Sequence, residues 1–525
     1  MKNNTATINP IQSGSGNLFT RNTAFLAALS GLLLFLSFPR YGSGWLAWIA
    51  FIPLFFALKK PVTMTQGLVL GFITGMVSYV GIIYWIAFVI INYGFLPLYL
   101  GIILMLLLAC YLSFYIALFA GCIVYLREKM PLYLTAPVLW ICFEYGKSYL
   151  LTGFPWENLG YSQYLNTYLL QFADIAGVFG LSFLIVLFNA ALFEMINKRT
   201  KREYAIGCMV VFVLAGVYIY GIYRLDQVNQ AVQNSEGMEV SLIQGNIDQS
   251  LKWNEDYQRE TLNIYEQLSL KNSPANGSLI VWPETAAPFL FQDRNILHDQ
   301  IVNLSLKTKS WLLFGSVSHA RENGGNDFFN SAYLLSPAGV VKGKYDKVHL
   351  VPYGEYVPFR DIFPFVKKLT AGIGDFGTGP GFYPLSLDHK KIGILICYEG
   401  ILPFAARRYK QQSTDLLVNI TNDAWFGATS APFQHFSMSV FRAVETRLYL
   451  VRAANTGISG IIDPGGRIIA KTNIFQKNAL KGYIKFVNIP TFYAQYGDIL
   501  AMICFGLIIF YFLMNLKWRV GNANR

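Results

Sequence analysis

Charged residues are scarce in this sequence, and the shortage is confined to part of it. Aspartate, glutamate, lysine and arginine make up 14% of the 525 residues, whereas a soluble domain usually carries about 25%. Residues 24–223 and 497–516 hold few charges, while 224–496 has the composition of an ordinary soluble domain. The shortage excludes a wholly soluble protein and predicts a membrane protein with one large domain outside the bilayer.

Histidine and cysteine are scarce as well. Of five histidines, only His349 and His435 lie near sequence motifs. Neither has the spacing to another histidine or cysteine that a zinc site requires, and no Ser-His-Asp arrangement is visible. Five of the six cysteines lie inside apolar runs, namely Cys110, Cys122, Cys142, Cys208 and Cys504. Cys397 therefore has no disulfide partner within its own domain and is a candidate nucleophile.

Apolar runs long enough for membrane helices, about 20 residues each, predict about eight spans. They lie near residues 23–38, 44–58, 66–91, 97–126, 132–150, 172–196, 204–223 and 497–516. The first two are short and interrupted, so the count carries an error of one. No signal-peptide cleavage site follows the first run, which we expect to remain in the protein. The expected order is a tail (1–22), a transmembrane domain of about seven helices (23–223), the large domain (224–496), a final helix (497–516) and a tail (517–525).

Lysine and arginine gather at alternate ends of these runs. One set of ends carries Lys2, Arg21, Lys59, Lys60, Arg127, Lys129, the run 198–202, Lys517 and Arg519, and the other carries Arg40, Glu157 and Arg224. Because basic loops face the cytoplasm, we expect both termini inside and the large domain outside. The net charge of +12 then reflects this bias and attraction to anionic lipids rather than nucleic-acid binding.

Within residues 224–496, short apolar runs alternate with longer amphipathic ones. Strands are expected at 238–244, 279–282, 311–318, 331–335, 340–345, 392–396, 416–420, 457–462, 467–470 and 482–487, and helices at 254–271, 296–309, 402–411 and 435–453. This alternation predicts an α/β or mixed-sheet layered domain of ordinary single-domain size.

Three polar motifs end or follow predicted strands. Glu284 stands in Trp-Pro-Glu, Lys347 in Lys-Val-His-Leu, and Cys397 in Cys-Tyr-Glu. A partly buried carboxylate can take the proton of a thiol, and a lysine ammonium can stabilise a thiolate and a tetrahedral oxyanion. Together they indicate nucleophilic catalysis by Cys397. Lys344 is an alternative to Lys347, which is preferred because His-Leu follows it closely.

The order of these motifs resembles the nitrilase, or carbon–nitrogen hydrolase, superfamily over about residues 238–490. With about seven spans before the domain and one after it, the chain resembles the membrane-bound branch, the bacterial apolipoprotein N-acyltransferases. Segments 249–253 and 347–358 support the closer match. The resemblance implies an αββα sandwich carried by a helical domain of about eight transmembrane helices. It also implies a bacterial inner-membrane protein with its catalytic domain on the periplasmic side.

The resemblance implies a chemistry too. Cys397 would attack a phospholipid acyl ester to form a thioester, with Glu284 as general base and Lys347 as oxyanion stabiliser. The acyl chain would then pass to the α-amine of a diacylglyceryl-modified apolipoprotein. Glu355 would orient Lys347 or assist proton transfer, or would form a purely structural ion pair. No metal or organic cofactor is expected, and the few charges of the membrane domain are compatible with a monomer.

Two other functions stay open. A membrane-tethered amidohydrolase would use the same thioester and give the acyl group to water. A transporter or scaffold with a degenerate outer domain would need none of Glu284, Lys347 and Cys397, so the intact set argues against it.

Other residues are candidates for supporting roles. Glu399, two residues after the nucleophile, is expected to act in the site, while Tyr398 fits the site and the core equally well. Trp253 fits either a substrate lid or simple packing. Trp156 and Glu157 are expected to line a route for lipid.

Residues 363–376 are expected to form an apolar flap over the site, with Phe363 and Phe376 among its side chains. A Gly-x-Gly-x-x-Gly match inside this segment follows no strand, which argues against a dinucleotide site. Glu144 and Lys147, three residues apart in a predicted span, are expected to form a mutual pair on the helix surface.

Overall fold

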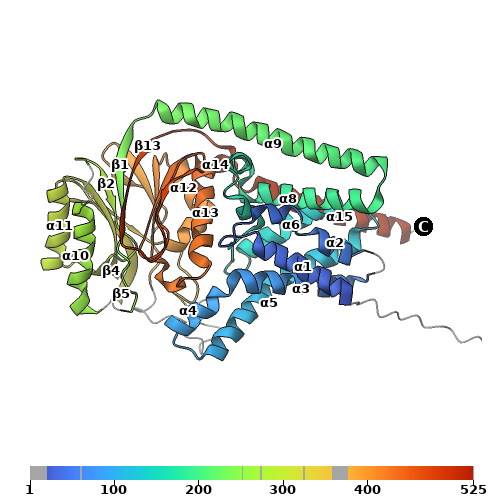
Figure 1. Ribbon diagram of the computed structural model, residues 1–525, viewed down its shortest axis with the longest axis horizontal. Helices are drawn as coiled ribbons and strands as arrows, with labels where there is room; N and C mark the ends of the chain where they lie inside the picture. Colours follow the sequence, from blue (N-terminus) through green and yellow to red (C-terminus); the bar gives the residue numbers. More distant parts are fainter. Residues whose placement is uncertain are drawn as a thin grey trace, which may run out of the picture.

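The computed structural model describes residues 21–59, 62–250, 252, 254–271, 275–322, 325–356 and 376–523. Helices gather in a bundle at one end of the molecule, and two β-sheets form the other end (Figure 1). One long helix, α9 (Lys201–Gln233), runs from the far end of the bundle to the sheets.

The bundle is built from apolar helices. They are α1 (Arg21–Leu36), η1 (Gly44–Trp48), α2 (Ile52–Ala57), α3 (Met64–Ile83), α4 (Trp85–Tyr93), α5 (Leu98–Leu126), α6 (Leu132–Tyr149), η2 (Leu159–Gln163), α7 (Thr167–Leu170), α8 (Ala173–Lys198), α9 and α15 (Ile499–Ala523). Helices α3 and α5 pack so closely that a Cβ on Gly71 would lie only 2.6 Å from the carbonyl oxygen of Ile116. Small residues commonly allow such close approach between membrane helices.

Four of the described helices, α3, α5, α8 and α9, are long and apolar enough to cross a membrane. The chain is thus a membrane protein with several candidate spans. The predicted number of eight spans is not shown by helix length and composition. The predicted single span 66–91 is wrong, since α3 ends at Ile83 and α4 is a separate helix. At the break, the Tyr84 hydroxyl accepts a hydrogen bond from the main chain of Ser430, in the sheet-bearing part.

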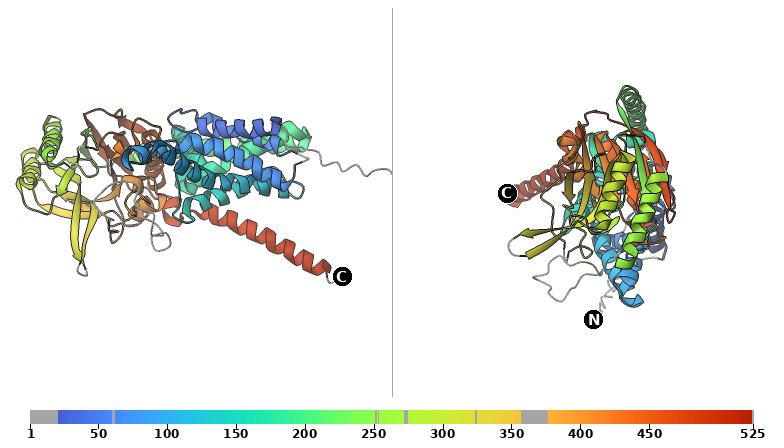
Figure 2. Two further views of the ribbon diagram at one scale, coloured as in Figure 1. Left: turned by 90° about the horizontal axis from the view of Figure 1, so that it is seen from below. Right: turned by 90° about the vertical axis from the view of Figure 1, so that its left-hand side faces the viewer.

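The long helices lead back and forth, so their connections gather at two ends of the bundle. At the end next to the sheets, Arg40 donates to the carbonyl of Ala428 at 3.1 Å. At the far end, Arg127 donates to the carbonyl of Leu58 at 2.6 Å. Helix α15 starts beside the sheets and diverges from the bundle toward the far end (Figure 2).

Two sheets pack face to face. The first has the strand order β13-β1-β2-β4-β5-β6 with β3 beside β4, and the second has the order β12-β11-β10-β9-β8-β7. Their strands are β1 (Gly237–Gln244), β2 (Leu279–Val281), β3 (Ala287–Leu290), β4 (Trp311–Glu322), β5 (Gly325–Leu335), β6 (Val341–Asp346), β7 (Leu385–Leu387), β8 (Lys390–Ile396), β9 (Leu416–Thr421), β10 (Tyr449–Ala454), β11 (Gly460–Ile462), β12 (Ile468–Lys471) and β13 (Asn478–Lys485).

Helices cover the outer face of each sheet. Helices α10 (Glu255–Lys271) and α11 (Ile296–Thr308) lie on the first sheet, and α12 (Pro403–Gln411) and α13 (Ala431–Thr446) lie on the second, between it and the bundle (Figure 1). A short helix, α14 (Phe492–Tyr496), precedes α15. The predicted α/β sandwich beside a helical membrane region is therefore confirmed.

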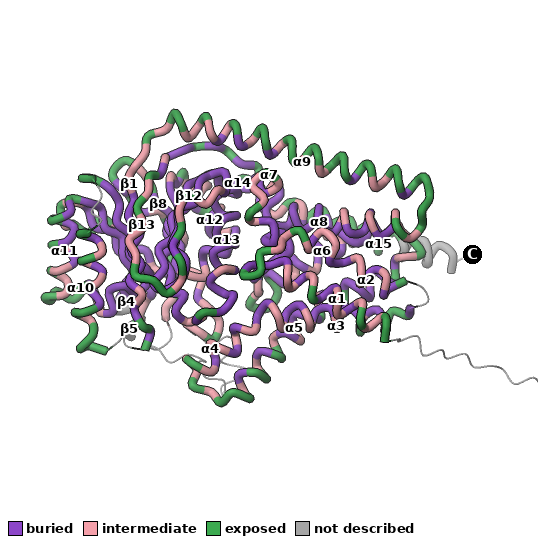
Figure 3. Tube along the Cα trace, viewed as in Figure 1, coloured by how far each residue is buried: buried purple, intermediate pink, exposed green. Residues whose placement is uncertain are grey.

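The central strands β8, β9 and β10 are parallel and almost wholly buried (Figure 3). Their continuous apolar runs suit this position, because both faces of the sheet are covered. The predicted helix 435–453 is wrong in its last third: Arg447 takes a left-handed φ of +53° after α13, and β10 follows. Without a glycine at that position, the sequence carries no helix-stop signal.

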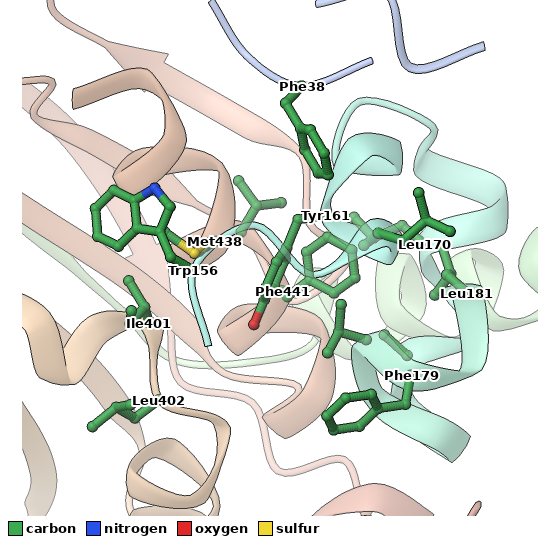
Figure 4. Packing of buried hydrophobic residues seen from close by; sticks show 14 of the residues in the cluster. Phe38, Trp156, Tyr161, Leu170, Phe179, Leu181, Ile401, Leu402, Met438 and Phe441 are labelled. Atoms are coloured by element: carbon green, nitrogen blue, oxygen red, sulfur yellow. The ribbon is translucent and has the colours of Figure 1, made fainter. Parts of the chain in front are cut away.

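The bundle and the sandwich share a buried interface around α13. Trp156 and Tyr161 of the segment after α6 lie near Met438 and Phe441 of α13 (Figure 4). The ring centroids of Tyr161 and Phe441 are 4.8 Å apart. Because α13 packs on the second sheet, this interface places the end of β8 close to the bundle.

Candidate active site

The three predicted motifs meet where strands of both sheets end. Glu284 comes three residues after β2, Lys347 directly after β6, and Cys397 directly after β8. The Nζ atom of Lys347 lies 3.8 Å from Oε1 of Glu284 and 2.8 Å from Oε2 of Glu355. The charges of Glu284 and Lys347 both act on the thiol of Cys397. The structure thus brings all four predicted residues together.

The Glu284 carboxylate is held at both oxygens. The side chain of Asn330 donates to Oε1 at 2.7 Å, and the main-chain N–H of Asn422 donates to Oε2 at 2.9 Å. The buried Lys252 donates to the main-chain carbonyl of Glu284 at 3.1 Å. A carboxylate fixed in this way is placed for proton transfer in a defined direction.

Lys347 is almost completely buried but stays charged. Burial opposes its ammonium form, yet Glu355 and then Glu284 outweigh that effect and raise the pKa of Lys347 above its usual range. Lys344, the alternative in the sequence, pairs instead with Asp346 at 3.0 Å and remains partly exposed. Only Lys347 of the two is placed as a cation beside Glu284.

Cys397 opens a short 3₁₀ turn, η3 (Cys397–Ile401), with a left-handed φ of +52°. Few residues other than glycine adopt this backbone conformation, and those that do cluster at functional sites. Burial raises the pKa of the thiol and Glu284 raises it further, while Lys347 opposes them. The thiol is therefore protonated at rest, so a nucleophilic role would require a base that takes its proton.

Glu399 connects the nucleophile turn to the lysine loop. Its fully buried carboxylate accepts hydrogen bonds from the Tyr345 hydroxyl and from three main-chain N–H groups, those of Ile396, Val348 and His349, all within 3.0 Å. Burial raises the pKa of Glu399 to about 7, and these N–H donors limit the rise. Glu399 thus links the segments that carry Lys347 and Cys397.

Tyr398 and Trp156 form an aromatic wall on the bundle side of the site. Their rings are stacked with centroids 6.4 Å apart. The indole of Trp156 is buried and donates to the side chain of Gln434 at 2.8 Å. Tyr398 also stacks on His349 at 5.9 Å. Both residues therefore border the site.

Part of the predicted lid lies outside the described residues, namely Trp253, Phe363 and the rest of the predicted flap up to residue 375. Phe376 is described. Its main-chain N–H donates to the carbonyl of Glu355 at 3.2 Å, so this residue borders the loop that carries the second carboxylate.

Glu144 and Lys147 do not form the expected surface pair. Both are buried, and each binds main-chain atoms of the segment after α6: Glu144 accepts from Leu159 at 2.6 Å, and Lys147 donates to the carbonyl of Trp156 at 3.1 Å. These two charges therefore hold the loop that carries the aromatic wall.

Sequence reasoning did not identify Lys252, Asn330 or Asn422 as site residues. Asn422 directly follows the buried strand β9, the parallel neighbour of β8. A polar residue after the next strand is a signal that could have found it, because parallel strands end at a common edge. In the described part of the chain, no cluster of three or more histidine, cysteine or acidic residues could hold a metal ion.

An αββα sandwich with glutamate, lysine and cysteine at its strand ends defines a nitrilase-like domain. Residues 239–490 match the carbon–nitrogen hydrolase family, and residues 30–191 match the apolipoprotein N-acyltransferase N-terminal domain. Among solved structures, Nit3 of Saccharomyces cerevisiae, a nitrilase-superfamily member, aligns over 49% of this chain and 92% of its own, with 17% identity and a TM-score of 0.38.

Curated relatives extend over most of the chain. The apolipoprotein N-acyltransferase of Geobacter metallireducens is 46% identical over 92% of this chain and 93% of its own length. That of Rickettsia prowazekii is 35% identical over 72% and 75%. The chain belongs to the apolipoprotein N-acyltransferase family and is an acyltransferase. The resemblance inferred from the three motifs is confirmed.

Proposed function

We propose that this protein moves a fatty acyl chain from a membrane phospholipid to the α-amine of a diacylglyceryl-cysteine apolipoprotein, through a thioester on Cys397. The observation that carries the proposal is the buried cluster of Glu284, Lys347 and Cys397 beside an apolar helical bundle. Family membership supports the same reaction.

In the first half-reaction, Glu284 accepts the thiol proton while Sγ of Cys397 attacks the ester carbonyl carbon. The carbonyl oxygen becomes an oxyanion, which the Lys347 ammonium stabilises. When the C–O bond breaks, Glu284 returns the proton to the leaving oxygen. A lysophospholipid departs, and the acyl chain remains on the enzyme as a thioester.

In the second half-reaction, the neutral α-amine of the acceptor attacks the thioester carbonyl. One amine proton passes to Glu284 and then to the departing thiolate of Cys397, so the product amide and the free thiol are formed together. Glu355, which contacts Lys347 at 2.8 Å, keeps the ammonium in place through both steps.

The surroundings of the nucleophile favour lipid substrates and transfer over hydrolysis. The wall made by Tyr398 and Trp156 is aromatic and continues into the bundle. Such a wall keeps water away from a thioester, which would otherwise be hydrolysed. Trp253, Phe363 and Phe376 are proposed to complete the cover, and Trp156 with Glu157 to border the lipid route.

The proposed membrane arrangement has eight crossings, by α1, the η1–α2 segment, α3, α5, α6, α8, α9 and α15. The tail 1–22, the transmembrane part 23–223, the catalytic domain 224–496, the last helix 497–516 and the tail 517–525 follow from it. Basic residues such as Lys59, Arg127 and Lys198 stand at or just after the ends of α2, α5 and α8, and these helices end far from the sheets (Figure 1). That bias supports cytoplasmic termini and a periplasmic catalytic domain in the inner membrane. The protein is proposed to act as a monomer without metal or cofactor.

The test is full turnover with a labelled phospholipid and a diacylglyceryl-cysteine peptide, with products identified by mass spectrometry. The proposal predicts acylated peptide and an equal amount of lysophospholipid, both absent with Cys397→Ala. If free fatty acid forms while the peptide stays unmodified, the protein is instead the membrane-tethered hydrolase.

A further inference from the structure

His435 of α13 lies beside the nucleophile but contacts the wrong atom for a base. Its Nε2 is 3.2 Å from the main-chain oxygen of Cys397, and its Nδ1 is 3.0 Å from Oδ1 of Asp423. The imidazole is fully buried. A histidine between an aspartate and a catalytic cysteine suggests a Cys-His-Asp triad, yet here the ring faces the carbonyl of the cysteine.

A second side chain contacts the same carbonyl. Nδ2 of Asn419 donates to the Cys397 oxygen at 3.3 Å and to the Leu395 oxygen at 2.8 Å. The carbonyl of Cys397 is thus bonded from two sides, by β9 and by α13. This peptide follows a residue at φ +52°, a conformation that persists only when its surroundings fix it.

Arg452 of β10 organises both donors. The fully buried guanidinium donates to Oδ1 of Asn419, which turns the amide nitrogen toward Cys397. It also contacts Oδ2 of Asp423 at 2.9 Å and Nδ1 of His435 at 3.0 Å. One rigid fork therefore sets the orientation of an amide, a carboxylate and an imidazole.

The hydrogen-bond partners define the state of His435. Burial and then Arg452 lower the pKa of His435, while Asp423 opposes them. A carbonyl can only accept, which places a ring proton on Nε2, and Nδ1 lies 3.0 Å from both Oδ1 of Asp423 and the Arg452 guanidinium. In this form His435 has no free nitrogen to take a proton from the thiol.

We propose that Asn419, Asp423, His435 and Arg452 form a carbonyl clamp, a set of positioning residues that fixes the Cys397 peptide and so aims the thiol at Glu284 and Lys347. The next residue after β9, Asn422, donates to Glu284, so the same strand end sets both the base and the nucleophile. The inference rests on the proposed function, in which Cys397 is acylated.

Two substitutions separate positioning from proton transfer. His435→Phe keeps the ring volume and removes the donor, whereas His435→Gln keeps an N–H near the position of Nε2. We expect His435→Phe to slow Cys397 acylation about 100-fold at saturating phospholipid, as misplacement of a reacting group does. His435→Gln should stay within about tenfold of wild type, since it loses only part of one hydrogen bond.

The readouts are the rate constant for acylation, the KM for phospholipid, the pH profile and the melting temperature. The clamp predicts a fall in the rate constant with KM changed less than about twofold and an unchanged pH profile. Thr446→Val, on the same helix but outside the clamp, is the control and should match wild type. If His435→Phe does not fold, Arg452→Lys is used instead, because it keeps the charge without the planar fork. Its acylation rate constant should lie between about tenfold and about 100-fold below that of wild type.

Wild-type rates in His435→Phe would overturn the clamp. So would a His435→Gln variant as slow as His435→Phe with one limb of the pH profile lost, because His435 would then transfer a proton. Alkylation of Cys397 by iodoacetamide, followed on its own peptide, needs no acyl donor. If wild type is never acylated but alkylation is slowed by His435→Phe and restored by His435→Gln, the proposed function fails and the clamp stands; unchanged alkylation overturns the clamp.

Discussion

The sandwich and the bundle both bury charged side chains, but they use them differently. Around Cys397 the charged groups face one another: Lys347 lies between Glu284 and Glu355, all within 4 Å. In the bundle, Glu144 and Lys147 bind main-chain atoms of a single loop. The sandwich is therefore proposed to carry the chemistry, while Glu144 and Lys147 hold the loop that carries Trp156.

The largest effect is expected from the base. Glu284→Gln keeps the shape and the contact with Asn330 but cannot accept a proton, so acylation of Cys397 should slow by about 10³-fold. Single-turnover acylation followed by mass spectrometry measures this loss. Glu266→Gln on α10, which pairs with Lys307 away from the site, is the control. If Glu284→Gln acylates Cys397 at the wild-type rate, another residue must act as the base.

A pH effect on stability should follow from Glu399. Its pKa is raised to about 7 by burial, against about 4.3 in an unfolded chain. The folded protein then holds this proton more tightly, so its stability falls as pH rises from about 4 to about 7. Relative to Glu399→Gln, which does not titrate, wild type should lose about 3 kcal/mol over that window. Melting temperatures of both proteins in detergent test this; a constant difference would contradict it.

The bundle should respond in stability rather than in chemistry. Lys147→Met removes the buried donor to the carbonyl of Trp156, at a cost of about 1–3 kcal/mol. The melting temperature should fall, while acylation per folded molecule should change far less than in Glu284→Gln. Lys198→Met, at a partly exposed pair with Glu194, is the matched control. A thousandfold loss of acylation with normal stability would place Lys147 in the chemistry.

The smallest effect separates the two candidate lysines. Lys344 forms a partly exposed pair with Asp346, and such pairs contribute about 0–1 kcal/mol. Lys344→Met should therefore acylate Cys397 at a rate close to wild type, whereas Lys347→Met should lose most activity. Acylation rates of both variants, measured side by side, decide between them, and the reverse ranking would assign the oxyanion role to Lys344.

The sequence predicted those site residues that lie within three residues of the end of a predicted strand, because strand ends are marked in the chain itself. Glu284, Lys347 and Cys397 are of this kind. Asn330 lies inside β5 and Lys252 lies in a loop, and only the folded sheets bring them to Glu284.

Dependence on contacts between distant residues also explains the errors in the predicted fold. The apolar residues of β10 fit a helix and a buried strand equally well, and only pairing with β9 decides between them. The break at Tyr84 coincides with a hydrogen bond from the main chain of Ser430, 346 residues away. Neither contact can be predicted from the local periodicity of apolar residues.

The decisive measurement is the mass of the Cys397 peptide after incubation with phospholipid in the absence of acceptor. The proposed thioester predicts one acyl chain on Cys397, an equal amount of lysophospholipid, and no adduct on the other five cysteines. Lysophospholipid released with no adduct on Cys397, or an adduct on another residue, would contradict it.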